Sequence, residues 1–94
     1  MGYKLRFHEL ALAEWKKLDG SVREPLKQKL AERLETPRVP AAALSGMPDC
    51  YKIKLRRLGF RLIYRVDDDI LFVTVIAVGK RDKAEVHEAA KTRT

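Results

Sequence analysis

Apolar and polar residues alternate at the start of the chain and then change their period. Between Tyr3 and Phe7 the odd positions are apolar and the two between them are basic, which is typical of a strand with one buried face. Over residues 9–18, apolar residues recur at spacings of three and four. This spacing predicts an amphipathic helix after the strand.

Asp19 and Gly20 interrupt the helical pattern and separate this helix from a second one. Ser21 followed by Glu24 matches the capping-box pattern, and a helical apolar period then runs to about Glu35. Pro25 is tolerable near a helix start, but it could itself be the first helical residue, so both starting points remain open. Three prolines and a glycine then punctuate a long connecting loop before residue 50, and loops of that length often carry contacts.

The second half of the chain has the pattern of strands. Residues 51–56 and 61–66 alternate around a turn at Gly59, which predicts an antiparallel hairpin. The segment from Ile70 to Val78 is apolar on both faces, as expected for a central strand covered on two sides. Residues 84–91 have weak helical character and few large apolar residues, so we expect a loosely packed C-terminal helix.

Together these elements predict one α+β domain over residues 1–94. We expect a small sheet of about four mostly antiparallel strands, with two N-terminal helices and a short C-terminal helix. The longest apolar run is far shorter than the roughly 20 residues of a membrane helix, and the N-terminus lacks the apolar core of a signal peptide. A single cysteine, Cys50, excludes an internal disulfide. We therefore expect a cytoplasmic protein without membrane contact.

Charge changes this picture. Twenty Lys and Arg against 13 Asp and Glu give a net charge of +7. The stretch from Tyr51 to Arg65 contains six basic residues and no acidic one: Lys52, Lys54, Arg56, Arg57, Arg61 and Arg65. The strand period places Lys52, Lys54 and Arg56 on one face. A solvated sheet face would explain an isolated pair of lysines, but six cations without an acid favour phosphate binding.

Other candidate residues lie outside this stretch. Lys80 and Arg81 follow the central strand, where the pattern fits both a basic turn and a functional loop. His87 could transfer protons at neutral pH, although a surface histidine on a short helix is the commoner case. Trp15 and Phe60 are best explained as residues of the core or its edge.

The motifs that are missing narrow the chemistry. The sequence has no phosphate-binding P-loop, no Cys/His metal cluster and no nucleophilic-serine motif, and the acidic run 67–69 lies in a turn. Phosphodiester cleavage would then proceed without a metal or other cofactor, with cations stabilising the pentavalent phosphate and a lysine or histidine moving protons. Clustered cations lower a lysine pKa, which would make Lys52 or Lys54 a better base. The substrate would be RNA, because DNA lacks the 2′-hydroxyl that attacks.

Three segments, YKIKLR (51–56), GFRLIY (59–64) and VGKR (78–81), closely resemble the RelE family of bacterial toxin-antitoxin toxins. WKKL (15–18), VRE (22–24) and GMPDCY (46–51) extend the likeness over nearly the whole chain. The resemblance implies a small α+β toxin that inhibits translation. It would cut mRNA in the ribosomal A site and leave a 2′,3′-cyclic phosphate and a 5′-hydroxyl.

The resemblance also implies roles for individual residues. Lys52 and Lys54 match the paired lysines of the family, with Lys54 as the expected general base. Arg61 matches the arginine that stabilises the transition state, and Arg81 the one that assists the leaving group. His87 stands where the family often has a tyrosine that stacks on or orients the substrate. The neighbouring cations expected to bind RNA are Arg56, Arg57, Arg65 and Lys80.

The partners implied by the resemblance are the ribosome with its mRNA and a RelB-type antitoxin. The antitoxin would wrap the toxin and disturb its C-terminal helix or mask its basic face, and operator DNA would be contacted only through the antitoxin. Two other functions stay open at the level of sequence. One is a ParE-like inhibitor of DNA gyrase, and the other is a basic nucleic-acid-binding module without catalysis, whose binding would depend steeply on salt.

Overall fold

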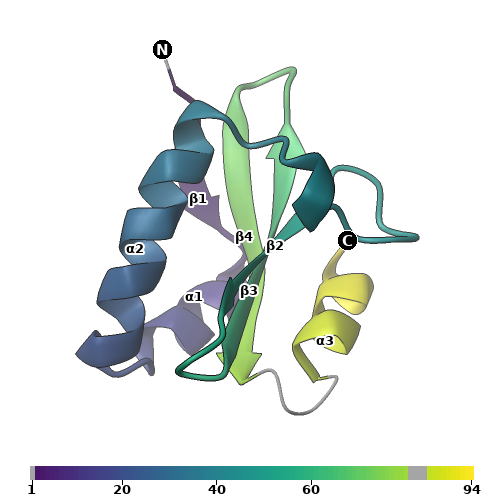
Figure 1. Ribbon diagram of the computed structural model, residues 1–94. Helices are drawn as coiled ribbons and strands as arrows, with labels where there is room; N and C mark the ends of the chain where they lie inside the picture. The colour runs from purple at the N-terminus through teal and green to yellow at the C-terminus, as the bar shows by residue number, and fades with distance from the viewer. Residues whose placement is uncertain (1, 81–84) are drawn as a thin grey trace.

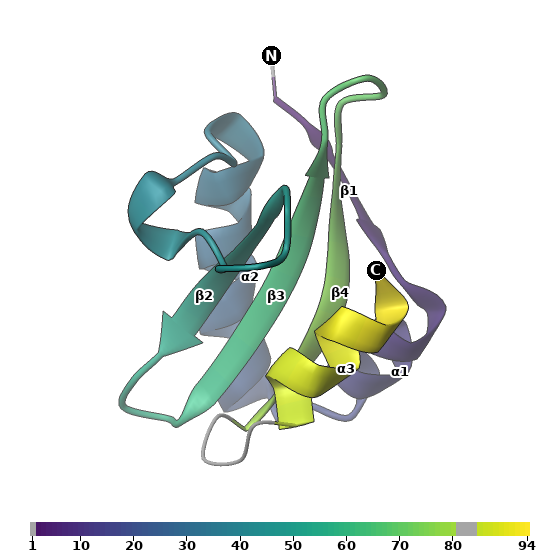
Figure 2. The same cartoon turned by 90° about the vertical axis from the view of Figure 1, so that its right-hand side faces the viewer.

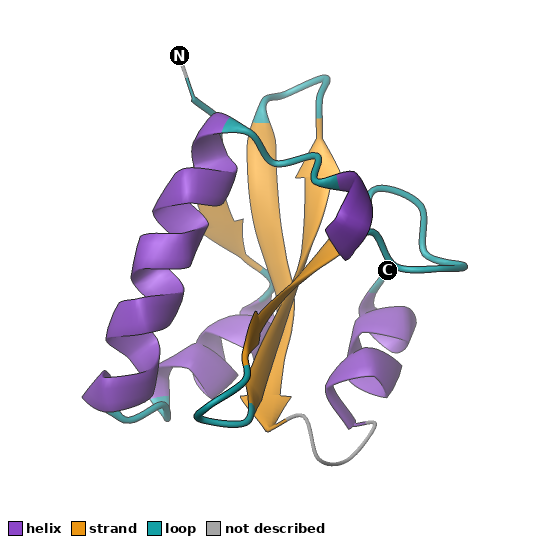
Figure 3. Ribbon diagram, viewed as in Figure 1, coloured by secondary structure: helices purple, strands orange, loops and turns teal. Residues whose placement is uncertain are grey.

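The computed structural model describes residues 2–80 and 85–94, which fold as three α-helices and a four-stranded sheet (Figures 1 and 3). The elements in chain order are β1 (Lys4–Phe7), α1 (Glu9–Lys16), α2 (Gly20–Glu35), a short 3₁₀-helix (Pro40–Ala42), β2 (Cys50–Leu55), β3 (Phe60–Asp67), β4 (Phe72–Lys80) and α3 (Glu85–Arg93). The α+β class and the order of helices and strands are as the sequence predicts.

The strands lie in the order β1-β4-β3-β2, so β4 is central and β2 is an edge strand. The β2–β3 and β3–β4 pairs are antiparallel, whereas β1 pairs with β4 in parallel. The predicted hairpin and the mostly antiparallel sheet are therefore confirmed. Because β4 is buried on both faces from Val73 to Val78, the prediction of a doubly covered central strand is also correct.

The two faces of the sheet are covered by different helices. Figure 2, in which α3 lies in front of the sheet and α2 behind it, shows this arrangement. The larger cluster of buried residues joins α1 and α2 to one face through Ala11, Leu26 and Leu30. Trp15 and Phe60 pack at its edge, as expected. The smaller cluster joins α3 to the other face through Val86 and Ala90.

A β-bulge gives α3 its apolar support. Ile63 pairs with Ala77, but the next residue of β3, Tyr64, pairs with Val75, so Ile76 is an extra residue in β4. In a regular strand Ile76 and Ala77 would point to opposite faces. Both instead belong to the cluster beneath α3. The bulge thus allows a helix with few large apolar residues to be held by the sheet.

The start of α2 differs from the prediction. Asp19 is the N-cap, and its carboxylate accepts a hydrogen bond from the Ser21 amide at 3.0 Å, so Ser21 lies inside the helix and does not cap it. Pro25 is also inside α2, not at its first position. The aspartate was available as a cap because its extended backbone (φ −65°, ψ 150°) directs the side chain at the free amides of the first turn.

Two boundaries in the second half also need correction. Ile70 and Leu71 are about half exposed and belong to the turn before β4, which begins at Phe72. Leu71 has a positive φ of 56°, which ends the extended conformation that the apolar pattern suggested. Arg56 lies beyond the last residue of β2, in the exposed turn of the hairpin. It therefore does not continue the row of Lys52 and Lys54 on the strand.

The long loop between α2 and β2 is tied to the sheet by polar contacts. Arg38 donates to the Tyr51 hydroxyl at 3.1 Å and forms ion pairs with Asp68 at 2.7 Å and Asp49 at 3.0 Å. These bonds connect the loop to β2 and to the turn between β3 and β4, so the expectation that the loop carries contacts is correct. Within residues 2–80 and 85–94, no helix has the length and apolar character needed to cross a membrane.

Candidate active site

The sheet register brings three of the predicted site residues onto one face. Lys54 pairs with Arg61, and Lys52 pairs with Ile63 two residues further along. Directly paired residues project to the same side of a sheet, so these four side chains share a face. Ile63 packs against α3. We call Lys52, Lys54 and Arg61 the cationic row; it lies on the face that α3 covers.

Electrostatic repulsion within the row changes the chemistry of Lys54. The Lys52 ammonium has the largest effect, followed by partial desolvation and the charge of Arg61, and together they lower the pKa of Lys54. None of the three residues forms an ion pair with a described carboxylate. The row is therefore a site of uncompensated positive charge, which is suited to an anion with several oxygen atoms.

Arg61 contains an unsatisfied donor. Its Nε is buried and has no hydrogen-bond partner among the residues that the structure describes. A buried N–H without an acceptor costs free energy, so such groups often mark the position of a ligand. A guanidinium beside two lysines offers a planar set of donors to phosphate oxygens.

The backbone of the row is supported by two residues that the sequence did not single out, Arg33 of α2 and Tyr64 of β3. Arg33 donates to the Lys52 carbonyl at 3.2 Å and to the Tyr64 hydroxyl at 2.9 Å. Tyr64, which is fully buried, donates in turn to the Pro37 carbonyl at 2.6 Å. One signal could have revealed Arg33: the helical period places it on the same side of α2 as Leu26 and Leu30, where a charged residue needs a partner.

Helix α3 borders the row on the side of β4. Its buried residues Val86 and Ala90 pack against the cluster that includes Ile63. Gly79, the pairing partner of Arg61, lies so close to α3 that a Cβ at this position would be 3.1 Å from the Val86 Cγ2. A glycine here lets the helix approach the sheet at the level of Arg61. His87, next to Val86, is half-buried.

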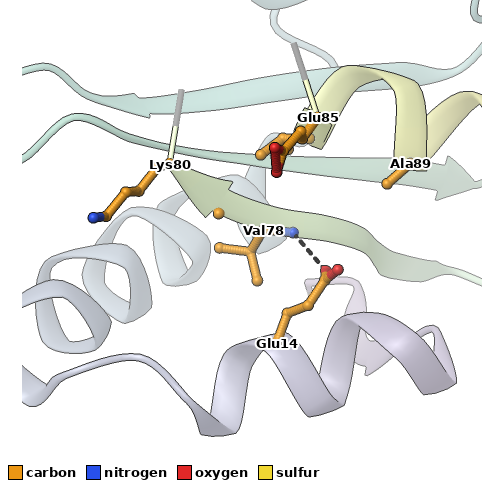
Figure 4. Close-up of a pocket in the computed structure, with 7 residues that line it drawn as sticks. Glu14, Val78, Lys80, Glu85 and Ala89 are labelled. Carbon is orange, nitrogen blue, oxygen red and sulfur yellow. Dashed lines mark hydrogen bonds between the residues drawn. The ribbon is translucent and has the colours of Figure 1, made fainter. Parts of the chain in front are cut away.

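A cavity of about 340 Å³ lies between α1, the end of β4 and α3 (Figure 4). Glu14, Val78 and Ala89 line it together with two charged residues, Lys80 and Glu85. Within it the Val78 amide donates to the Glu14 carboxylate at 3.2 Å. Its carboxylates make it a poor site for RNA phosphate, which favours the opposite side of α3 for that ligand.

The remaining predicted residues have different surroundings. Arg56 and Arg57 are exposed in the hairpin turn, and Lys80 is exposed at the end of β4. Arg65 is half-buried and forms an ion pair with Asp67 at 3.3 Å, so the basic stretch is not entirely without acidic partners. Arg81, the fourth cation expected in the catalytic site, lies outside the described residues.

No group of three His, Cys, Asp or Glu side chains in the described part of the chain could hold a metal ion. Two residues of the acidic run are instead engaged with arginines and a tyrosine: Arg6 and Arg65 pair with Asp67, while Arg38 and Tyr3 bond Asp68. These carboxylates have a structural role in joining the loops at one end of the sheet.

Comparison with known proteins then places this geometry in a family. The family model described as "ParE toxin of type II toxin-antitoxin system, parDE" matches residues 5–85. The chain is also 57% identical over 93 residues to "mRNA interferase toxin RelE" of Escherichia coli strain K12, covering 99% of this chain and 98% of the relative. The chain belongs to the RelE/ParE toxin family. The resemblance seen in the sequence is thus confirmed.

Solved structures of the RelE/ParE family have the same fold. A mutant of E. coli RelE in the free state superposes with a TM-score of 0.92 at 56% identity, covering 99% of this chain and 98% of that one. RelE in the intact E. coli RelBE toxin-antitoxin complex gives a TM-score of 0.83 at 58% identity, covering 86% of this chain and 99% of that one. The free mutant therefore matches nearly the whole of this chain, whereas RelE from the complex matches a smaller part of it.

Proposed function

We propose that this chain is the toxin of a type II toxin-antitoxin system and acts as an mRNA interferase, an endoribonuclease that needs no metal. The observation that carries the proposal is the cationic row, in which Lys54 has a lowered pKa and no acidic partner among the described residues. The relative that is 57% identical, called an mRNA interferase toxin, supports the same reaction. Repelling cations cost stability unless an anion occupies them.

The proposed reaction is an internal transfer at phosphorus. Lys54, in its neutral form, takes the proton of a ribose 2′-hydroxyl, and the resulting oxygen attacks the adjacent phosphorus. Arg61 and Lys52 stabilise the extra negative charge of the pentavalent state. The bond from phosphorus to the 5′-oxygen then breaks, giving a 2′,3′-cyclic phosphate and a 5′-hydroxyl. The leaving 5′-oxygen takes up a proton from His87 or from water; we assign stabilisation of its negative charge to Arg81, and proton transfer or stacking to His87.

The row is only partly exposed, since Lys52, Lys54 and Arg61 are half-buried, but it is not enclosed by other elements on the side of β2, which is an edge strand, and this supports the ribosome as the site of cleavage. Two depressions that share Lys54 and Arg56 in their lining contain further cations, namely Lys29, Arg33 and Arg57. These groups attract phosphate but distinguish bases weakly. We therefore propose that the ribosomal A site orients the mRNA, while Arg56, Arg57, Arg65 and Lys80 bind further RNA phosphates.

We also propose a RelB-type antitoxin as the protein partner. The solved E. coli relative occurs in an intact RelBE toxin-antitoxin complex. A partner that neutralises a +7 toxin should bring acidic residues, and operator DNA would be contacted through the antitoxin. Since the proposed substrate is ribosome-bound mRNA, the cytoplasm is the proposed location.

A second candidate function rests on the family model itself, which is described as a ParE toxin. This description favours inhibition of DNA gyrase, without RNA cleavage. The 57% identity to an mRNA interferase and the cationic row favour the nuclease instead. Induction that causes DNA damage and leaves mRNA intact would establish the ParE-like function and reject the nuclease.

The experiment that tests the proposal maps mRNA 5′ ends in a purified translation system. We expect Lys54→Ala and Arg61→Ala to reduce cleavage by about 10²- to 10⁴-fold, because each removes a group that acts in the transition state. Lys27→Ala removes the same charge from an exposed position on α2 and serves as the control. Full cleavage by both site variants would refute the assignment.

A further inference from the structure

The outer edge of β4 is completed by side chains where β1 ends. The parallel pairing of β1 with β4 stops at Phe7 and Val75, so beyond this point β4 has no strand on the edge opposite β3. Glu14 of α1 accepts a hydrogen bond from the Val78 amide at 3.2 Å. Arg93 of α3 donates to the Ile76 carbonyl at 2.9 Å. A buried strand edge needs such partners, and two helices supply them.

These two side chains also bind each other. The Arg93 guanidinium donates to both oxygens of Glu14, at 2.8 and 2.9 Å, which is the bidentate geometry of strong ion pairs. The Arg93 side chain is only 12% exposed and that of Glu14 is 32% exposed. Partial burial would raise the pKa of Glu14, but the bonds from Arg93 and the Val78 amide outweigh it and hold that pKa below its usual value.

The ion pair lies on one flank of α3, and the cationic row lies on the other. Glu85 and Ala89, which share the side of Arg93, line the cavity beside α1 (Figure 4). Lys91 and Thr94, on the opposite side of the helix, lie near Arg65 of β3. His87 is four residues before Lys91 and therefore shares that flank. The ion pair holds the Arg93 side of α3 in place, and the helix therefore directs His87 toward β3 and the cationic row.

Alone, α3 has little to hold it in this orientation. It has nine residues, which is too short for a stable isolated helix, and its buried side chains are the small residues Val86 and Ala90. Small side chains permit sliding and rotation on a sheet, whereas a bidentate bond to a fixed carboxylate specifies one position.

We propose that Arg93 is a positioning residue for RNA cleavage: through Glu14 and the Ile76 carbonyl, it fixes the rotation of α3 so that His87 faces the cationic row. This inference rests on the proposed nuclease function. Arg93 itself lies on the far flank and does not contact the substrate. Its removal should slow turnover and leave substrate binding nearly intact, because the cations that attract RNA stay in place.

The test compares Arg93→Ala, Glu14→Gln and Arg93→Lys in steady-state cleavage of mRNA on programmed ribosomes. We expect Arg93→Ala to lower kcat by about tenfold to a hundredfold with KM changed by less than about threefold, and Glu14→Gln to act in the same direction. Arg93→Lys should restore part of kcat. Arg38→Ala is the matched control, since it breaks an arginine ion pair at the other end of the sheet and should leave kcat unchanged.

A double-mutant cycle with His87→Ala separates positioning from general destabilisation. If Arg93 acts through His87, Arg93→Ala should cost little in the His87→Ala background. Losses that multiply would overturn the proposal, as would a wild-type kcat for Arg93→Ala. Hydrogen exchange provides a readout independent of activity: amides of α3 should lose protection in Arg93→Ala and keep it in Arg38→Ala. Unchanged protection would also overturn the proposal.

Failure of the inference and failure of the proposed function can be distinguished. If wild type cleaves mRNA and Arg93→Ala cleaves it equally fast, only the positioning role is rejected. If wild type cleaves no mRNA under any condition, the nuclease function is rejected and the positioning role falls with it, even where hydrogen exchange shows that Arg93 holds α3.

Discussion

At the scale of single residues, the chemistry of the site comes from neighbours across one hairpin. Lys54 is an ordinary lysine in sequence, and its lowered pKa depends on Lys52 beside it and Arg61 opposite it. A lysine used as a base at neutral pH must release its proton more readily than a free lysine, whose pKa is about 10.4. The same repulsion that achieves this also opposes folding, which is a common feature of functional sites.

We expect the pH dependence of cleavage to report the pKa of Lys54. As general base, Lys54 must be neutral, so kcat should rise with pH. The midpoint of this ascending limb of the pH profile should lie below the usual pKa of lysine. Lys52→Ala removes the largest cause of the lowered pKa, so the limb should move to higher pH. The measurement is single-turnover cleavage over roughly pH 6 to 9.

Arg56→Ala provides an internal comparison for this prediction. Arg56 also lowers the pKa of Lys54, but by less than Lys52, so the limb should move in the same direction by a smaller amount. A limb that stays in place in both variants would show that another group is the base.

At the scale of elements, α2 is the foundation of the site. It packs on the sheet through Val22, Leu26 and Leu30, and it supports β2 through Arg33. A helix of 16 residues has little stability of its own, so these contacts with the sheet hold it in place. The cationic row therefore depends on the burial of apolar side chains on the opposite face of the sheet.

Leu30→Ala should destabilise the protein by about 2–5 kcal/mol, because Leu30 is only 1% exposed and its removal leaves a cavity under α2. This is a large fraction of the roughly 5–15 kcal/mol typical of a domain. Urea unfolding followed by circular dichroism would measure the change. Gln28→Ala, at an exposed position of the same helix, should change the free energy of unfolding by less than about 0.5 kcal/mol.

At the scale of the whole molecule, the net charge of +7 is distributed unevenly. Acidic residues gather at the end of the sheet where Arg38 and Asp68 meet, and cations with no ion pair to a described carboxylate gather along β2 and its hairpin turn. Such a separation creates a field that draws RNA toward one face. Binding should therefore weaken as salt screens the field.

We expect Arg57→Ala to reduce the salt dependence of RNA binding more than Arg65→Ala does. Arg57 is exposed in the hairpin turn, whereas Arg65 is already paired with Asp67. Removing one cation that neutralises a phosphate should lower the slope of log K against log salt by about 0.7. Titration of a 2′-O-methyl RNA, which cannot be cleaved, would measure both slopes, and equal slopes for the two variants would contradict the distinction.

The sequence by itself determined most elements and the shared face of Lys52 and Lys54, whereas Arg61 joins the cationic row through the register of the folded hairpin. Alternation over residues 51–66 predicts a hairpin, and the two-residue period of a strand places Lys52 and Lys54 on the same face. Local pattern was less reliable at boundaries, since Asp19 replaced Ser21 as the cap and Ile70 proved to be a turn residue. Caps and turns depend on backbone angles, which residue types specify only weakly.

Only the tertiary structure decided which residues of distant segments satisfy each other's hydrogen bonds. Glu14 and Arg93 are 79 residues apart, and no periodicity relates them to the edge of β4 that they satisfy together. The bulge at Ile76 and the support of Lys52 by Arg33 are likewise set by packing between elements. The physical reason is the sequence separation over which each effect acts. Hydrophobic period and charge pattern are local to one strand or helix, whereas a buried polar group bonds to whichever residue the folded chain places next to it.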